Sequence, residues 1–451
     1  MFIPGPGYDG TVMMRILDLR DVALTPKNSG NFVPRLEVHA DELDDTVAAL
    51  LAEVKAEGST ALRRQAEKFD GVAPESIRVS EADLKKAASE LDSTLKKALE
   101  ESIRRVRAAS EDMVPATVVT DYHSGGQVMT RFVPVDRAGV YVPGGKAVYP
   151  SSVVMNVVAA QAAGVTDIVL VSPPQQDFAG GIHPTIAAAA HLLGVTEVYA
   201  MGGAGAIAAL TWGVPDLALE PVSVITGPGN RYVATAKKLV KGHVAIDSEA
   251  GPTEICIIAD ETAHPELVAA DLVSQAEHDE LASAILITTS MELGERVQLA
   301  LARKVGATHH AARVREALTG QQSALMVLDS LEQCIDMANA VASEHLEVMV
   351  ENPDVVLDGI RHAGAIFVGN YTPVSAGDYL AGSNHVLPTA GTARFTSGLS
   401  PFTFLKTQQV VEYDEAGLRA ISDMIVTLAK AENLPAHGDA VLERFSETTE
   451  L

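Results

Sequence analysis

Two patterns of hydrophobic positions divide the chain. Between residues 41 and 113 apolar residues recur at intervals of three and four, as at Leu43, Val47 and Leu50, with charged residues between them. This spacing places the apolar side chains on one face of a helix and predicts amphipathic helices. Beyond residue 121, Gly and Pro separate short runs of Val, Ile, Leu and Tyr, which predicts strands that end in tight turns.

A short internal repeat has the length of one strand plus one crossover helix. Residues 164–171 are echoed thirty positions later by residues 194–201, and an Ala-rich stretch precedes each copy. A third apolar run, residues 222–225, follows after a similar interval. Successive units of this kind predict a parallel sheet with helices on both faces.

The alternation of strand and helix resumes after residue 251, so the sheet pattern occurs twice. Residues 370–401 then form a segment rich in Gly, Ser, Thr, Pro and Asn, and a stretch of this length without regular structure is a candidate functional loop. One amphipathic helix, residues 417–433, leads to an acidic end. Between these landmarks we expect strands at residues 254–259, 284–288, 346–350 and 365–368. We expect helices at residues 265–277 and 332–344, and a further helix that follows the strand at 284–288 and ends at residue 303.

Composition and charge narrow the class of protein. The 451 residues are 47% hydrophobic and 21% charged, which is typical of a globular chain of about three domains. A formal net charge of −25 argues against binding to nucleic acid or to an anionic membrane. Two cysteines, no signal-peptide pattern and no long uncharged apolar run favour a soluble, cytoplasmic protein.

Side chains suited to a metal occur in three places. Gln275 and His278 are three apart near the end of an expected helix, so both would share one face and reach one metal; the alternative is a solvated helix end. Asp378 and His385 lie in the Gly-rich loop and are ligand types suited to zinc, although an Asx turn and an exposed histidine remain equally compatible. His437 follows the last expected helix, where a terminal surface histidine is the alternative.

Glu344 and His345 place an acid and a base side by side. Both are expected at the end of a helix, with His345 on its apolar face four residues after Val341. A buried imidazole beside a carboxylate has a tunable pKa, about 6.5 when unperturbed. Adjacent helical residues point in different directions, so the two would act on different protons; a purely structural histidine is the alternative.

Glycine-rich turns follow three of the expected strands, at residues 143–145, 202–205 and 227–230. Backbone amides at such turns can cradle a cofactor phosphate. None of the three contains the full G-x-G-x-x-G fingerprint, so any dinucleotide site would be atypical, and ordinary strand-end turns remain the alternative.

Taken in order, these segments resemble the histidinol dehydrogenase family over nearly the whole chain, from residue 16 to residue 437. The most specific matching segments are residues 139–145, 227–230, 250–254, 275–278, 343–347 and 382–398. The resemblance implies an α/β fold of two incomplete Rossmann-like domains with parallel sheets and small N- and C-terminal segments. The implied divisions are an N-terminal segment at 1–36, a first Rossmann-like domain with zinc and the acid/base pair at 37–135 and 252–398, a second with the nucleotide at 136–251, and a C-terminal helical segment at 399–451 that is exchanged in a dimer.

The resemblance also implies an activity. Members of this family are zinc-dependent homodimers that oxidise L-histidinol to L-histidine through L-histidinaldehyde with two NAD molecules in succession, the last step of histidine biosynthesis. By match to the family motifs, Glu344 and His345 form the acid/base pair. The implied zinc ligands are Gln275, His278, Asp378 and His437; the implied substrate contacts are Thr253, Gln275, His278, His345, Asp378, His385, Glu432 and His437; the implied nucleotide contacts are Tyr141, Gly205 and Asn230.

Two positions depart from the family pattern. Gly205 stands where the family usually has Gln, so one nucleotide contact is missing or replaced. Thr253 stands where Ser is frequent and keeps the hydroxyl group. Neither departure touches the implied metal ligands or the acid/base pair.

The chemistry explains why an acid and a base are needed. Converting a primary alcohol into a carboxylate removes two hydrides and adds one water oxygen. A neutral His345 would accept the hydroxyl proton in the first oxidation, and Glu344 would activate the water that hydrates the aldehyde. The loop beginning near residue 370 is a candidate wall for retaining that aldehyde, and zinc would orient the substrate through its amino and imidazole nitrogens.

Two other classes of protein remain open from the residues themselves. In a zinc hydrolase, Glu344 or Glu277 would activate a metal-bound water, and the glycine turns would be only turns. In a catalytically idle protein, the same pocket would bind a nucleotide or metabolite without turnover. Formation of NADH separates an oxidoreductase from both.

Overall fold

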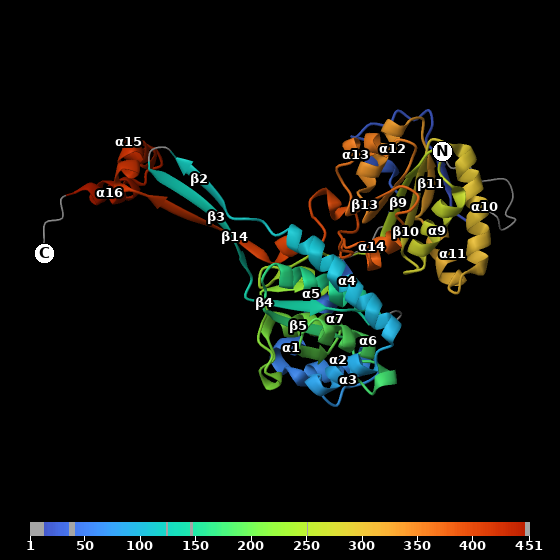
Figure 1. The fold of residues 1–451 in the computed structure, drawn as a ribbon, viewed down its shortest axis with the longest axis horizontal. Coiled ribbons are helices and arrows are strands. Elements are labelled where there is room, and N and C mark those ends of the chain that lie inside the picture. Colours follow the sequence, from blue (N-terminus) through green and yellow to red (C-terminus); the bar gives the residue numbers. More distant parts are fainter. Residues whose placement is uncertain (1–12, 36–40, 123–124, 145–147, 250, 447–451) are drawn as a thin grey trace. The chain divides into compact units, whose positions relative to one another are not determined.

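The computed structural model describes residues 13–35, 41–122, 125–144, 148–249 and 251–446 (Figure 1). The chain forms two compact units. The first unit contains Asp136–Phe404 together with the residues up to Asp112, and the second combines Met113–Val135 with Leu405–Leu451.

The first unit contains two sheets in which every paired strand is parallel. The five-stranded sheet consists of β4 (Arg137–Tyr141), β5 (Asp167–Ser172), β6 (Glu197–Ala200), β7 (Val224–Thr226) and β8 (Ala245–Ile246). The six-stranded sheet consists of β1 (Ile16–Asp18), β9 (Glu254–Ala259), β10 (Ser283–Thr288), β11 (Ala324–Val327), β12 (His345–Met349) and β13 (Ala365–Val368).

The two sheets share one strand order. The five-stranded sheet runs β6-β5-β4-β7-β8, and the six-stranded sheet runs β1-β11-β10-β9-β12-β13. Counted along the chain from β4 and from β9, both orders are 3-2-1-4-5, which is the arrangement of a doubly wound Rossmann-like sheet. The prediction of two incomplete Rossmann-like domains with parallel sheets is confirmed. The repeat is confirmed as well, because β5 and β6 begin thirty residues apart.

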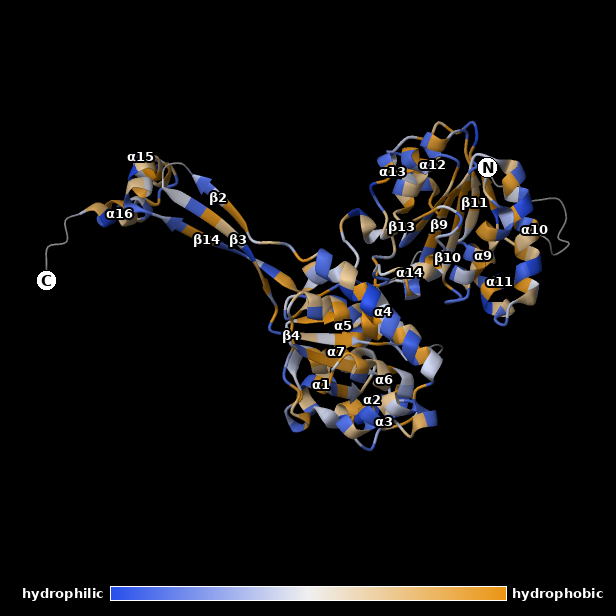
Figure 2. Ribbon diagram, viewed as in Figure 1, coloured by the Kyte–Doolittle hydropathy of each residue, from blue (hydrophilic) through white to orange (hydrophobic). Residues whose placement is uncertain are grey.

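Most helices packed on the five-stranded sheet are hydrophobic on nearly all sides; the last of them, at residues 231–240, is amphipathic, with Arg231 and Lys238 exposed. Their bounds are α5 (Pro150–Ala162), α6 (Pro184–Leu192), α7 (Gly203–Trp212) and α8 (Arg231–Val240). Residues 151–160 of α5 and 204–211 of α7 are all buried, and Figure 2 shows both helices as largely hydrophobic. A helix without a polar face needs a further covering layer.

That covering layer comes from the N-terminal helices, namely α1 (Asp41–Glu57), α2 (Ser59–Phe69), α3 (Glu81–Glu90) and α4 (Ser93–Asp112). Helix α1 packs on α7 and α8, α3 packs on α6, and α4 packs on α5. These contacts join residues 41–112 to residues 136–251, whereas the domain division from the sequence placed residues 37–135 with residues 252–398. The difference arises because the amphipathic helices cover the apolar helices of the five-stranded sheet.

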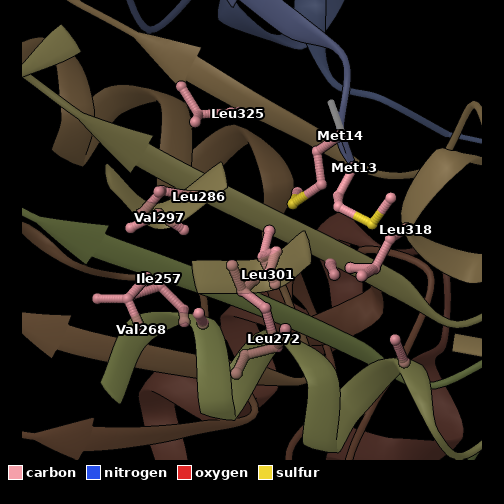
Figure 3. Close-up of a cluster of buried hydrophobic side chains, with 14 of the residues drawn as sticks. Met13, Met14, Ile257, Val268, Leu272, Leu286, Val297, Leu301, Leu318 and Leu325 are labelled. Atoms are coloured by element: carbon pink, nitrogen blue, oxygen red, sulfur yellow. The ribbon is translucent and has the colours of Figure 1, made fainter. Parts of the chain in front are cut away.

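The six-stranded sheet is covered on both faces. Its helices are α9 (Pro265–Ala276), α10 (Met291–Ala307), α11 (Ala311–Thr319), α12 (Leu331–Val341) and α13 (Pro353–Gly359). In the core on the α9 face, Val268 and Leu272 lie near Ile257 of β9 (Figure 3). Met13 and Met14 complete this core, and the Gln298 amide binds the Met14 backbone on both sides, at 3.1 Å from its N and 2.6 Å from its O.

Helix α12 ends earlier than the sequence pattern predicts. A helix was expected through residue 344, but α12 ends at Val341 because Ala342 adopts a left-handed conformation with φ 49°. Glu344 therefore lies outside the helix, and His345 is the first residue of β12. Its expected inward orientation is confirmed, since His345 is buried.

The expected loop at residues 370–401 is not entirely irregular. It contains one helix, α14 (Val374–Tyr379), followed by a short 3-10 turn at Thr392–Arg394. Asp378 therefore belongs to a helix, whereas His385 lies in the irregular segment after it.

The second unit is an antiparallel sheet with two helices. Its strands β2 (Val118–Tyr122), β3 (Gly126–Pro134) and β14 (Leu405–Tyr413) run in the order β14-β3-β2, and its helices are α15 (Glu415–Ala431) and α16 (Pro435–Leu442). The sequence analysis missed these strands and placed His437 after the last helix, whereas it lies within α16. In the described part of the chain, no helix has the length and apolar character needed to cross a bilayer.

Leu272 gives a test of the core under α9. We expect Leu272→Ala, at a fully buried position, to lower the free energy of unfolding by about 2–5 kcal/mol because it leaves a cavity against the sheet. The matched control is Leu267→Ala on the same helix, where the side chain is 37% exposed and the loss should stay below about 1 kcal/mol. Urea titrations of both variants measure the difference, and equal losses would contradict the assigned helix face.

Candidate active site

The acid/base candidates lie at the amino end of β12, beside the amino end of β9. Strand β12 pairs with β9 in parallel, with His345 opposite Ile255. This register brings Glu254 beside both candidates: its N–H donates to Glu344 Oε2 at 3.0 Å, and its carbonyl lies 3.0 Å from His345 Nδ1. The peptide groups of one residue thus hold the carboxylate and the imidazole together.

The Glu254 carbonyl determines which His345 nitrogen carries the proton. A carbonyl oxygen only accepts hydrogen bonds, so Nδ1 is the donor and the neutral ring has its lone pair on Nε2. Burial lowers the pKa of His345, an effect that the nearby Asp378 carboxylate opposes. The imidazole is therefore suited to accept a proton at Nε2 near neutral pH.

Glu344 is a buried carboxyl group with two hydrogen-bond donors. The Thr253 hydroxyl donates to Glu344 Oε2 at 2.5 Å, in addition to the Glu254 N–H. Burial raises the pKa of Glu344 to about 7, although both hydrogen bonds and the nearby His278 act in the opposite direction. A carboxyl group that titrates near neutral pH can both accept and release a proton.

Gln275 is connected to this group through Thr253. Its Nε2 donates to Thr253 Oγ1 at 2.6 Å, so the amide oxygen is the end that remains for a ligand role. Helix α9 ends at Ala276, and His278 lies in the turn that follows, with its N–H 3.3 Å from the Gln275 carbonyl. The expected shared helix face is therefore wrong in detail, because a turn rather than a helical repeat places His278.

Asp378 and His385 are joined through the Asp378 backbone. His385 Nδ1 lies 3.0 Å from the Asp378 carbonyl, and its Nε2 lies 3.2 Å from the Ser152 hydroxyl on α5. Burial lowers the pKa of His385 to about 4, so this ring is neutral and accepts from Ser152. Burial raises the pKa of Asp378, whereas His345 and His278 lower it, which shows that these charges lie within interaction range. Ser152 was not predicted as a site residue, because it lies on a helix far from His385 in sequence.

The predicted zinc ligands are distributed over both units. Gln275, His278 and Asp378 belong to the first unit, whereas His437 belongs to the second. Among the residues that the structure describes, no group of three or more His, Cys, Asp or Glu is arranged to hold a metal. The predicted set has only two such side chains in the first unit, since its third member there is an amide. Two imidazoles, a carboxylate and an amide oxygen nevertheless form a donor set that suits zinc.

A pocket of about 110 Å³ is lined by residues at the edges of both sheets. The turn after β7 lines it with Gly227 and Gly229, and the six-stranded sheet contributes Thr253 and Glu344, with His385 beside them. Strands β4 and β7 flank the point where the order of the five-stranded sheet reverses, and ligands of such sheets bind outside the carboxyl ends of these strands. The pocket thus combines the carboxyl edge of one sheet with the amino edge of the other.

The turn after β7 is fixed by a buried ion pair that the sequence analysis also missed. Lys237 and Asp247 form this pair, and both bind Gly227: Asp247 Oδ2 accepts its N–H at 2.8 Å, and Lys237 Nζ donates to its carbonyl at 3.0 Å. Gly227 has φ 111°, and a Cβ there would lie 1.9 Å from the Tyr141 carbonyl oxygen. Only glycine fits at this turn.

The predicted nucleotide contacts lie along the same edge of the five-stranded sheet. Tyr141 ends β4, and its hydroxyl accepts from the Gly203 N–H at 3.3 Å. Asn230 caps α8, with Oδ1 3.0 Å from the Tyr232 N–H. Gly205 lies in α7 at a close helix approach, where a Cβ would lie 2.6 Å from Gln65 Oε1 of α2.

Three further predicted residues lie either outside the described residues or outside the first unit. Gly145 of the first glycine turn and Ala250 of the segment before β9 lie outside the described residues. Glu432 follows α15 directly and belongs with His437 to the second unit.

Two Rossmann-like sheets and a buried carboxylate–imidazole pair, of which Glu344 lines the pocket, define an α/β enzyme. The sequence model of the histidinol dehydrogenase family matches residues 33–445. The chain therefore belongs to the histidinol dehydrogenase family and is an oxidoreductase.

Known histidinol dehydrogenases are similar to this chain over nearly its full length. The histidinol dehydrogenase of Leifsonia xyli subsp. xyli is 54% identical over 96% of this chain and 100% of its own length. That of Corynebacterium diphtheriae is 51% identical over 96% of this chain and 98% of its own. A crystal structure of histidinol dehydrogenase from Elizabethkingia anophelis matches with a TM-score of 0.90 and 34% identity, covering 96% of this chain and 98% of that one.

Thr253 provides a test of the hydrogen-bonded group. Thr253→Val keeps the shape of the side chain but leaves Gln275 Nε2 without its acceptor and Glu344 without one donor. We expect a loss of about 1–3 kcal/mol in the free energy of unfolding and a further rise in the pKa of Glu344. Thr253→Ser keeps the hydroxyl and serves as the control; urea titration should show it close to the parent protein, and a Val variant of equal stability would disprove the bridge.

Proposed function

We propose that this protein catalyses the NAD- and zinc-dependent four-electron oxidation of L-histidinol to L-histidine through L-histidinaldehyde, the last step of histidine biosynthesis. The observation that carries this proposal is the Glu344–His345 pair held on the Glu254 peptide groups, with Nε2 of His345 left as the base. The names of the relatives at 50% identity and above support the substrate.

In the first oxidation, His345 Nε2 takes the proton of the substrate hydroxyl as the C–H bond breaks. The hydride and the hydroxyl proton leave together, and the aldehyde is formed. When bound, NAD accepts the hydride in each of the two oxidations. The Nδ1–H bond to the Glu254 carbonyl stabilises the imidazolium that results, because the carbonyl dipole faces the new charge.

The second oxidation needs a water molecule. Glu344, with its pKa near 7, takes a proton from water as the oxygen adds to the aldehyde carbon, and the imidazolium of His345 returns its proton to the carbonyl oxygen, which leaves the ring neutral again. His345 then accepts the hydroxyl proton of the hydrate, and the second hydride leaves. The sum is alcohol, water and two NAD⁺ giving carboxylate, two NADH and three protons.

Metal and nucleotide binding follow from the remaining predicted residues. Gln275, His278, Asp378 and His437 would hold zinc, which supplies a fixed point for the amino and imidazole nitrogens of the substrate. The nucleotide residues would be Tyr141, Gly205 and Asn230, beside amide groups of the turn after β7. The further substrate contacts would be Thr253, His385 and Glu432.

We further propose a homodimer in which the second unit supplies Glu432 and His437 to the partner's site. The support is the surface of that unit: Val411, Met424 and Leu428 are each at least 60% exposed, although all three are large and apolar. Exposed apolar groups of this kind are typical of a surface covered by another chain. Residues 136–251 would then form the nucleotide half of the enzyme, and residues 252–398 the zinc and acid/base half.

The stoichiometry of NADH formation tests the reaction. We expect two NADH for each L-histidinol consumed, no NADH after metal chelation, and recovery on addition of zinc. Absorbance of NADH against consumed substrate gives the ratio. One NADH with free aldehyde would refute the hydration role of Glu344, and none with zinc present would return the chain to the class of idle binding proteins.

Zinc content separates the metal ligands from the acid/base pair. Asp378→Asn and His437→Ala should each lose zinc and turnover together, because each removes one ligand. Glu344→Gln should keep zinc and lose turnover by roughly 100-fold or more, since its role is proton transfer. Metal analysis of the dialysed proteins checks this, and a zinc-free Glu344→Gln protein would overturn the division of roles.

A further inference from the structure

Two carboxyl groups lie against each other beneath the acid/base pair. Glu347 on β12 is two residues after His345 and only 1% exposed, and Asp271 lies on α9. Successive strand residues alternate between faces, so Glu347 shares the face of His345 and stands opposite Ile257 of β9. Helix α9 covers this face, as Figure 3 shows for Val268 and Leu272.

The two carboxyl oxygens of Glu347 have different surroundings. Its Oε1 accepts from the Val374 N–H at 3.1 Å. Its Oε2 is buried, and no donor from the described residues reaches it. The side chain of Asp271 lies close enough to that of Glu347 for the two carboxyl groups to share a hydrogen bond. Two carboxyl groups bond only if one is protonated, and we assign the proton to Glu347 because it is the more deeply buried of the two and its Oε2 has no other partner among the described residues.

This pair connects three elements that carry the active site. Val374 begins α14, which holds Asp378 one turn later. Asp271 lies one turn before Gln275 on α9. Glu347 itself shares a short strand with His345. A single carboxylic acid is therefore bonded, directly or through Asp271, to the helices of two predicted zinc ligands while its own strand carries the base.

We propose that Glu347, retained as the neutral acid and bonded to Asp271, is a positioning residue that fixes α9 and α14 against β12. The roles of the residues that it positions rest on the function proposed above. Its own role is to hold Gln275 and Asp378 in place relative to His345, and it does not contact the reacting atoms.

Electrostatics agrees with this assignment. Burial raises the pKa of Glu347, and the neighbouring Asp271 carboxylate raises it further. Burial also raises the pKa of Asp271, but Lys304 lowers it, which favours Asp271 as the charged member of the pair. Lys304 is itself 3.3 Å from Glu266, which places this charge toward the outer side of the helix layer.

Glutamine has nearly the same shape and the same hydrogen-bonding groups as a neutral glutamic acid. In Glu347→Gln, the amide NH₂ can donate to Asp271 and the amide oxygen can accept from Val374, as the protonated carboxyl does. An ionised Glu347 would have no such mimic, because an amide cannot replace two acceptors. Glu347→Leu fills the site but removes both bonds.

The experiment compares these two variants in the full-length zinc-loaded protein. We expect Glu347→Gln to keep its zinc and to hold kcat within about threefold of the parent, whereas Glu347→Leu loses zinc on dialysis and roughly 100-fold in kcat. The infrared difference spectrum of parent minus Glu347→Gln at pH 8 should show the carbonyl band of a protonated carboxyl. Met349→Leu, on the same face of β12, is the control for altered packing and should resemble the parent.

Two results would overturn the proposal. The first is a Glu347→Gln protein that loses zinc and kcat as severely as Glu347→Leu. The second is a difference spectrum without the protonated carboxyl band. Both readouts are independent of the reaction, since zinc retention and the infrared band remain measurable even if the parent protein forms no NADH from L-histidinol.

Discussion

The parallel pairing of β12 with β9 is the constraint on which the site depends. Neither Glu344 nor His345 would meet the Glu254 peptide groups if this register moved, and a slip by one residue would also exchange the faces of the strand. The same pairing aligns Glu347 with Ile257 under α9. The proposed proton transfer, the proposed ligand placement and the hydrophobic core thus depend on one set of backbone hydrogen bonds, and the left-handed Ala342 ends α12 before these bonds begin.

The two sheets have one topology but use opposite edges. The five-stranded sheet presents the carboxyl ends of β4 and β7, as the general rule for such sheets describes. The six-stranded sheet presents the amino ends of β9 and β12, where the acid/base pair lies. At its own carboxyl edge, Asp260 accepts N–H groups from Thr262 and Glu351. The proposed reaction takes place where these two unlike edges line one pocket.

Sequence patterns predicted the fold best where the residues of a strand are continuously buried. Strands 254–259 and 365–368 were predicted with their observed bounds because continuous apolar runs of that length fit a buried parallel strand. The end of α12 was missed because Ala342, unlike glycine, gives no signal for a left-handed residue. Glu254 was missed because it acts through its peptide groups, and a backbone role leaves no trace in side-chain type. Glu347 was missed because its partner Asp271 is distant in sequence and nothing local distinguishes a buried acid from an exposed one.

The second unit is assembled from segments far apart in the chain. Strand β3 pairs along its whole length with β14, so residues 126–134 have no partner on that side until residues 405–413 exist. During synthesis on a ribosome, both Rossmann-like sheets can therefore form before the antiparallel sheet does, and β3 must wait as an unpaired edge for almost the entire remaining translation. A chain truncated before β14 would therefore leave this edge of β3 without its partner strand.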